Sequence, residues 1–330
     1  MFESPVARAS FRIDPWPPDY GVSLQTEFDE DSTFQPLVQT DVEPVSWDEG
    51  ITAPPVDRPR SIVFVDGVQR IDAWGFIDDG ERAVEAALAS VAVGAVDCTP
   101  EGASVVTWRV ERLLALAGAR EALSMHVAAG ARTLEFRPVF SSRNDLSGRA
   151  AVNDAVSRRR HEMERRLGEE WLQDERLVVV DGRLSAPSSE SAVVGLTKTI
   201  HQLYLEDPER RLLPKLGPGQ RTPVFRIEYD SRTTRFSWFL RLADARPINH
   251  ALAGVVRIET PDIGAGAAIR LADLTSACLP AFASRPEHDP RAPQNLLPVG
   301  ALEKRLRHEM GDQLFIRRAI EDHLMQEVMA

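Results

Sequence analysis

The sequence predicts an α/β fold in which a mixed β-sheet is flanked by helices. Two short apolar runs each lead into Asp-Gly, at residues 62–67 (IVFVDG) and 177–182 (LVVVDG). A long segment rich in Arg and Glu, residues 153–172, comes just before the second run. A helix that leads into a buried apolar strand is typical of a sheet with parallel strand pairs.

The first half of the predicted fold begins with an antiparallel meander. Apolar and β-branched residues predict strands at 62–65, 68–77 and 85–96, with Asp66-Gly67 as the turn between the first two. The segments that follow are expected to be helical at 105–130, extended at 133–140 and helical at 153–172.

The second half adds strands and then helices. Strands are expected at 193–200 and 254–260, and a hairpin at 225–229 and 236–242. Helices are expected at 266–282 and 299–328. We therefore expect residues 61–330 to form one α/β domain.

Residues 1–60 predict an irregular N-terminal extension. They hold nine of the 23 prolines, together with twelve acidic residues and four arginines, and they show no helical periodicity. One interpretation is an arm that is partly disordered or that wraps the domain. The other is an acidic arm that covers a basic groove or contacts a partner.

Composition excludes several classes of protein. No apolar run approaches the length of a membrane span, and the first residues lack the apolar core of a secretory signal, so we expect no membrane association. Cys98 and Cys278 form no CxxC pair, which argues against a disulfide framework or a cysteine zinc site and favours the cytoplasm. Both Gly-rich phosphate-loop motifs are absent, which argues against an ATPase or a dinucleotide enzyme.

The net charge of −11 is unevenly distributed. The first 60 residues carry −8 of it, so the remaining 270 residues carry only −3. A nearly neutral domain can still present a basic groove to nucleic acid.

The two Asp-Gly sequences are the candidate site of chemistry. Asp66 and Asp181 each follow a buried strand, and two carboxylates placed side by side repel each other unless a cation bridges them. Carboxylate oxygens suit Mg²⁺ or Mn²⁺, and Glu162 or Glu164 on the preceding helix offers a third ligand. The plain alternative is that Asp-Gly marks ordinary turns and that the helix acids pair with arginines.

The order of these segments resembles the NurA nuclease family over roughly residues 60–325. The matching segments are IVFVDGVQRIDAW, ALASVAVGAVD, RLVVVDGRL, VVGLTKTI, SWFLRLAD and GVVRIET. The resemblance implies that the mixed sheet is RNase H-like.

The resemblance also implies which residues act. The family motifs fall on Asp66, Glu162 (or Glu164), Asp181 and Lys198 as catalytic residues, and the three acidic positions are the implied ligands of Mn²⁺ or Mg²⁺. Lys198 would stabilise the charge that develops on the phosphate. A lysine at the edge of a strand, without a catalytic role, is the alternative.

Two motifs depart from the family pattern. The family has a His close after a Pro-containing start, whereas here Glu303 comes first and His308 only later, so either residue is a candidate fourth ligand. The family often has Ser after the first Asp-Gly, and here that residue is Val68.

The function implied is that of a metal-dependent deoxyribonuclease that degrades DNA ends. The implied assembly is a homodimer that works with a hexameric HerA-type ATPase, the DNA translocase, in DNA end resection and repair or in anti-phage defence. The departures at Val68 and His308 motivate an alternative, a catalytically inactive NurA-like adaptor subunit of a HerA complex.

Basic residues mark a candidate DNA path. Some surround the helix acids and others follow the Lys198 strand, and the alternative for them is a solvated helix face. The candidate DNA-binding residues are Arg158, Arg159, Arg165, Arg210 and Arg211.

Overall fold

The computed structural model describes most of the chain. The described residues are 10–13, 36–78, 83–118, 124–172, 175–184, 193–198, 203–229, 233–244, 248–289 and 291–329.

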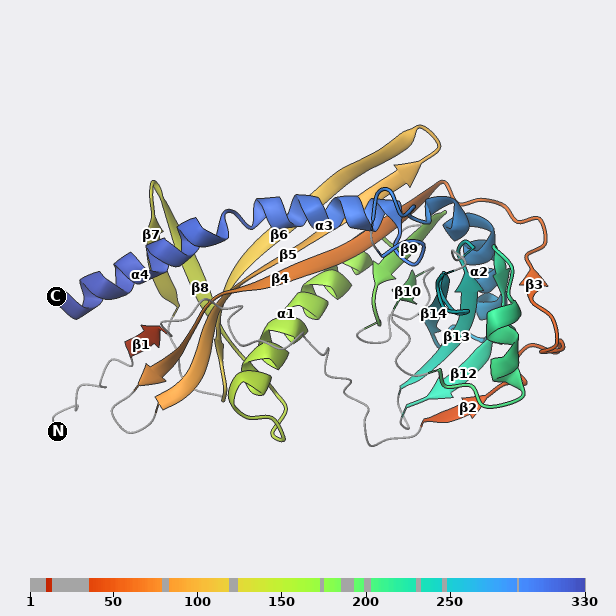
Figure 1. Ribbon diagram of the computed structural model, residues 1–330, viewed down its shortest axis with the longest axis horizontal. Coiled ribbons are helices and arrows are strands. Elements are labelled where there is room, and N and C mark those ends of the chain that lie inside the picture. Colours follow the sequence, from red (N-terminus) through yellow and green to blue (C-terminus); the bar gives the residue numbers. More distant parts are fainter. Residues whose placement is uncertain are drawn as a thin grey trace.

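The described strands join into one mixed sheet with helices on both faces (Figure 1). Its strands are β1 Ser10–Ile13, β2 Leu37–Gln39, β3 Ile51–Thr52, β4 Ser61–Asp78, β5 Ala83–Thr99, β6 Gly102–Leu116, β7 Met125–Ala129, β8 Arg132–Phe140, β9 Arg176–Asp181, β10 Val193–Thr197, β11 Gln220–Arg221, β12 Phe225–Glu228, β13 Thr234–Arg241 and β14 Val255–Pro261. The helices are α1 Gly148–Glu170, α2 Ala265–Cys278, α3 Leu297–Glu309 and α4 Gln313–Met329, with 3-10 helices η1 Glu209–Lys215 and η2 Leu279–Phe282.

The centre of the sheet has the strand order β6-β5-β4-β9-β10-β14. Strands β4, β5 and β6 form an antiparallel meander, whereas β4, β9 and β10 are parallel neighbours. Strand β14 closes this part antiparallel to β10. The predicted α/β fold, a mixed sheet flanked by helices and containing parallel pairs, is confirmed.

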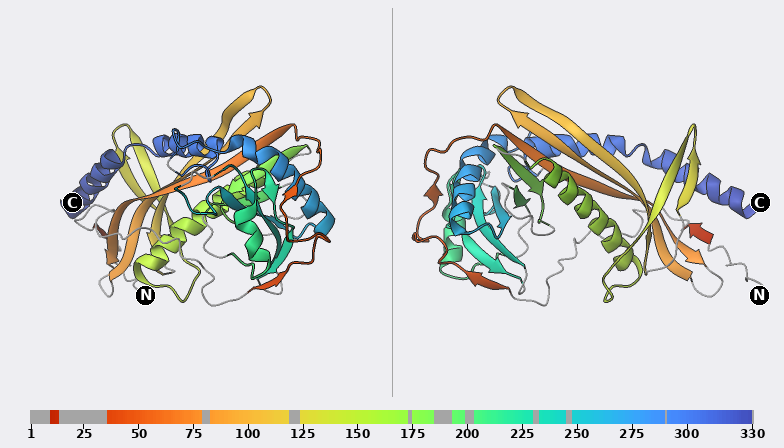
Figure 2. Two further views of the ribbon diagram at one scale, coloured as in Figure 1. Left: turned by 45° about the vertical axis from the view of Figure 1, so that its right-hand side comes forward. Right: turned by 180° about the vertical axis from the view of Figure 1, so that it is seen from behind.

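Successive side chains of β4 and β9 point to opposite faces of the sheet, and the core therefore has two layers. Val63 and Val65 of β4 pack with Val152 and Leu167 of α1 on one face. Phe64, one residue along from each of these valines, packs with α2 and α3 on the other face. Figure 2 shows α1 and α3 on opposite sides of the long β4–β6 strands.

Three local predictions were wrong, for identifiable reasons. Strand β4 continues through Asp66-Gly67, because both residues stay paired with β5, at Gly94 and Val93, so no turn forms there. The helix expected at 105–130 is instead strands β6 and β7, because β6 pairs along its whole length with β5. The helix expected at 299–328 is two helices, separated at Gly311, whose φ of +81° ends α3.

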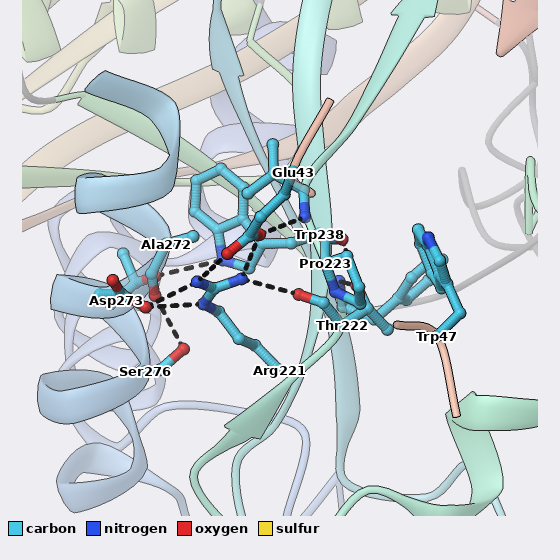
Figure 3. Close-up of polar contacts among 12 residues, drawn as sticks. Glu43, Trp47, Arg221, Thr222, Pro223, Trp238, Ala272, Asp273 and Ser276 are labelled. Carbon is cyan, nitrogen blue, oxygen red and sulfur yellow. Dashed lines mark hydrogen bonds and ion pairs between the residues drawn. The ribbon is translucent and has the colours of Figure 1, made fainter. Parts of the chain in front are cut away.

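The described part of the N-terminal extension packs on the domain. Strand β2 pairs with β12 and β3 pairs with β11. Between them, Glu43 reaches a buried arginine, Arg221, which donates to both Glu43 carboxylate oxygens at 2.8 and 2.9 Å (Figure 3). Arg221 also donates to Asp273 of α2 at 2.7 Å. Residues 36–52 therefore pack against the domain through these strands and through Glu43.

In the described part of the chain, every helix is too short or too polar to cross a membrane.

Candidate metal centre

Asp66 and Asp181 lie side by side on neighbouring parallel strands. Val65 of β4 is paired with Val180 of β9, and each aspartate is the next residue along its strand. Asp66 lies between Phe64 and Val68, and both of these pack in the core layer of α2 and α3. Because side chains alternate and parallel neighbours in register share a face, both carboxylates lie on the α3 side of the sheet.

Glu303 of α3 joins the two aspartates. One oxygen from each of Asp66, Asp181 and Glu303 lies within 4.8 Å of the others. Gly94, directly opposite Asp66 on β5, allows this approach, because a Cβ there would lie 3.0 Å from both Leu302 and Leu306 of α3. The absence of a side chain at Gly94 lets α3 come close enough for Glu303 to reach Asp66.

Asp66 is a buried carboxylate with an unpartnered oxygen. It is 4% exposed, and its Oδ1 accepts a 2.7 Å hydrogen bond from the backbone N–H of Gly67. Its Oδ2 is buried and has no hydrogen-bond partner among the described residues. Burial, the charge of Asp181 and then that of Glu164 raise the pKa of Asp66 well above its ordinary value. Three clustered carboxylates with an unpartnered buried oxygen are the donor set that a hard divalent cation takes.

Lys198 is brought into the same cluster. It follows the end of β10, where Leu196 is paired with Asp181, so Lys198 lies two residues further on the same face. Its Nζ is 2.5 Å from Asp181 Oδ2, and the Gln294 side chain donates to its backbone carbonyl at 3.2 Å. The lysine therefore places one positive charge directly beside the acidic cluster.

Glu164 approaches from the opposite side of the sheet. Its carboxylate lies over Gly67, because a Cβ on Gly67 would be only 2.4 Å from Glu164 Oε1. It is 2% exposed, and Arg160 donates to it at 2.6 Å. Glu164 of α1 is therefore held over Gly67, the residue after Asp66. Its charge contributes to the raised pKa of Asp66.

Glu162 lies outside this cluster. Two residues turn a helix by about 200°, so Glu162 and Glu164 occupy opposite sides of α1. The Glu162 side chain is 38% exposed and pairs with Arg159 at 2.7 Å and Arg166 at 2.5 Å. Of the two helix acids considered, the structure brings Glu164, not Glu162, close to Asp66.

His308 also lies outside the cluster, and Glu303 occupies its expected place. The two residues are five positions apart on α3, which turns the side chain by about 140°. His308 is exposed, whereas Glu303 faces the aspartates.

The candidate DNA-binding arginines lie on two separate elements and have local partners. On α1, Arg159 pairs with Glu111 and Glu162, and Arg165 pairs with Glu169. The remaining candidates bind nearby side chains or lie exposed on η1: Arg158 contacts Ser142, Arg211 pairs with Asp207, and Arg210 is exposed beside it. The structure does not bring the five together into one basic surface.

Sequence reasoning missed Arg291. Its guanidinium donates to both carboxylate oxygens of Glu303, at 2.8 and 2.9 Å, and contacts Asp289 at 3.1 Å. Arg291 lies in an irregular segment between α2 and α3 for which the sequence predicts no element. Nothing in its local pattern connects it to the Asp-Gly strands.

Two solved nuclease structures are similar to this chain. No family model and no curated protein matches the sequence. The crystal structure of the NurA nuclease from Sulfolobus solfataricus is similar over 83% of this chain and 87% of that chain, at 10% identity and a TM-score of 0.47. The catalytic domain of human endonuclease V is similar over 80% of this chain and 85% of that chain, at 17% identity and a TM-score of 0.33. The first of these structures is a NurA nuclease, and the sequence motifs of this chain resemble the NurA family.

Proposed function

We propose that the chain is a metal-dependent nuclease that cleaves DNA. The observation that carries this proposal is the cluster of Asp66, Asp181 and Glu303, whose carboxylate oxygens lie within 4.8 Å of one another, with Lys198 beside Asp181. Glu164, held over Gly67 on the other face, is the fourth acidic group of the site.

The residues of the cluster divide the work between them. A bound Mn²⁺ or Mg²⁺ supplies Lewis-acid stabilisation to a phosphodiester and lowers the pKa of an attacking water. Asp66 and Asp181 would hold the cation from the rigid sheet, and Glu303 would hold it from α3. Lys198 places its ammonium group where it can stabilise negative charge that develops on the phosphate oxygens.

The finer proposal is a deoxyribonuclease that acts on DNA ends delivered by a hexameric HerA-type ATPase. The motif order that resembles NurA nucleases supports it, as does the acidic overall charge of −11, which suits an enzyme whose partner holds the DNA. We propose that the chain works as a homodimer, in DNA end resection and repair or in anti-phage defence.

A second candidate is an inactive NurA-like adaptor on the HerA ring. The observation that favours it is that both carboxylate oxygens of Glu303 are bonded to Arg291. Val68 in place of the family serine also favours it. Calorimetric titration with Mn²⁺ separates the two, because an adaptor has no need of the cation and is expected to release no heat on titration.

Cleavage of linear DNA tests the proposal. Wild-type protein and Asp181→Ala are incubated with Mn²⁺ or with EDTA, each with and without the HerA-type partner. We expect cleavage by the wild type that needs Mn²⁺ and is lost in the variant. Absence of cleavage under every condition, with the complex intact, would support the adaptor. Equal cleavage by the variant would place the chemistry elsewhere in the molecule.

A further inference from the structure

Arg291 occupies the ligand oxygens of Glu303. Its two terminal nitrogens donate to Glu303 Oε1 at 2.8 Å and Oε2 at 2.9 Å, so the guanidinium faces the carboxylate edge to edge. One Glu303 oxygen is also among the three oxygens of the metal cluster. The guanidinium and a cation at this cluster would therefore share one carboxylate.

A divalent cation and a guanidinium compete for that carboxylate. Both are positive, and at the few ångströms that separate the partners of one carboxylate their repulsion is only partly screened in a site that is mostly buried. The Glu303 side chain is 13% exposed, whereas Arg291 is 49% exposed. Arg291 is therefore the partner that has open space to move into.

Asp289 tethers Arg291 beside the site independently of Glu303. Asp289 accepts from the backbone N–H of Arg291 at 2.8 Å and from its Nε at 3.2 Å. The Asn295 side chain fixes Asp289 in turn, at 2.6 Å. Release from Glu303 would thus leave the arginine anchored to Asp289 through its Nε and one terminal nitrogen, at 3.2 and 3.1 Å, with the guanidinium edge that held Glu303 available beside the cluster.

We propose that Arg291 is an exchange group: it neutralises Glu303 in the metal-free protein and binds a backbone phosphate of the nucleic acid once a cation has taken Glu303. The chemistry of the group favours this ligand, because the planar guanidinium fork matches a phosphate as well as it matches a carboxylate. The inference rests on the proposed nuclease function and adds a phosphate-binding residue to it.

The exchange predicts opposite effects of one substitution. Arg291→Gln removes the competitor of the cation, so Mn²⁺ affinity measured by calorimetry should rise about three- to tenfold. The same variant loses a phosphate contact, so its affinity for a short phosphorothioate-linked DNA duplex should fall about tenfold when Ca²⁺ fills the carboxylate site. The slope of log affinity against log salt concentration should fall by about one unit.

Arg109→Gln is the matched control. Arg109 forms an equivalent two-bond pair with Glu170, at 2.8 and 2.7 Å, and both side chains are 48% exposed. This variant removes the same charge away from the carboxylate cluster, so neither affinity should change by more than about twofold. Arg291→Lys keeps the charge and should retain the salt slope while it loses part of the DNA affinity.

Two outcomes overturn the exchange. If Arg291→Gln lowers both affinities, the arginine merely holds Glu303 in place. If it changes neither, the contact has no role in binding. Failure of the wild type to bind Mn²⁺ would instead contradict the proposed function itself, so the two failures are distinguishable.

Discussion

Asp66 and Asp181 each directly follow one residue of a parallel pair, Val65 of β4 and Val180 of β9. Their side chains therefore project from the same face of the sheet. Their segments are more than a hundred residues apart in the sequence. The parallel pairing of β4 with β9, the strand that follows α1, is what brings two like charges together. Such an arrangement stores electrostatic repulsion that a cation relieves.

Replacement of Asp66 by Asn should stabilise the metal-free protein. Burial, then Asp181 and Glu164, raise the pKa of Asp66, so the folded state binds its proton more tightly than the unfolded state does. Stability from this group is therefore present at low pH and is lost as the pH rises through the folded pKa. In EDTA at about pH 8, we expect Asp66→Asn to raise the unfolding free energy by on the order of 1–3 kcal/mol, and the gain should shrink as the pH falls.

Urea denaturation over a range of pH measures this effect, with the exposed Asp41→Asn as the control. Mn²⁺ should stabilise the wild type and leave the Asp66 variant unchanged. A variant that is less stable than the wild type at every pH would contradict the account of Asp66 as a repelled, unpartnered carboxylate.

Substitution of the two helix acids distinguishes their roles. Glu164→Gln removes a buried charge next to Asp66 and should weaken Mn²⁺ binding about tenfold or more. Glu162→Gln removes a half-exposed charge that pairs only with arginines of its own helix among the described contacts, and it should change Mn²⁺ affinity by less than about twofold. Calorimetry on both variants gives the comparison, and the reverse order would restore Glu162 as the ligand.

Removal of the Lys198 ammonium should separate cation binding from cleavage. Lys198→Gln removes a positive charge 2.5 Å from Asp181, so Mn²⁺ affinity should hold or increase. Cleavage should fall about 10²–10³-fold if the ammonium stabilises the transition state. Lys215→Gln, an exposed change on η1, serves as the control. Normal cleavage by Lys198→Gln would leave the lysine with a purely structural role beside Asp181.

The buried pairing of Glu43 with Arg221 should contribute strongly to stability. Arg221 is 1% exposed and neutralises both Glu43 and Asp273, so Arg221→Met leaves two uncompensated carboxylates. We expect a loss of about 3–5 kcal/mol in unfolding free energy. The control, Arg211→Met, removes an ion pair with Asp207 whose side chains are 70% and 58% exposed and should change stability by less than about 1 kcal/mol. Equal losses in urea denaturation would show that this contact of the N-terminal extension contributes no more to stability than an exposed ion pair does.

Local patterns in the sequence were enough to predict the two strands of the site and the helix between them. The apolar runs before Asp66 and Asp181, and the Arg- and Glu-rich segment of α1, each carry a strong local signal. The turn at Asp66 was wrong because Asp-Gly usually ends a strand, whereas here pairing with β5 keeps Asp66 and Gly67 extended. The helix at 105–130 was wrong because the first half of β6 is largely exposed and its extended form depends on pairing with β5.

The remaining site residues depend on contacts that no local pattern reveals. Glu162 and Glu164 lie in the same Arg- and Glu-rich stretch of the sequence, so local pattern does not distinguish them. Only the orientation of α1, which places Glu164 over Gly67, does so. Glu303 reaches Asp66 because Gly94 has no side chain and α3 can pack close to β5. Arg291 reaches Glu303 from an irregular segment between α2 and α3. These positions follow from packing between distant segments.

Anomalous scattering from crystals grown with Mn²⁺ tests the central claim most directly. The account predicts a manganese peak bounded by carboxylate oxygens of Asp66, Asp181 and Glu303, at about 2.0–2.4 Å from them, and absent from crystals of Asp66→Asn. A manganese peak elsewhere in the molecule would contradict this account. So would the absence of a peak at these carboxylates in a protein that still cleaves DNA.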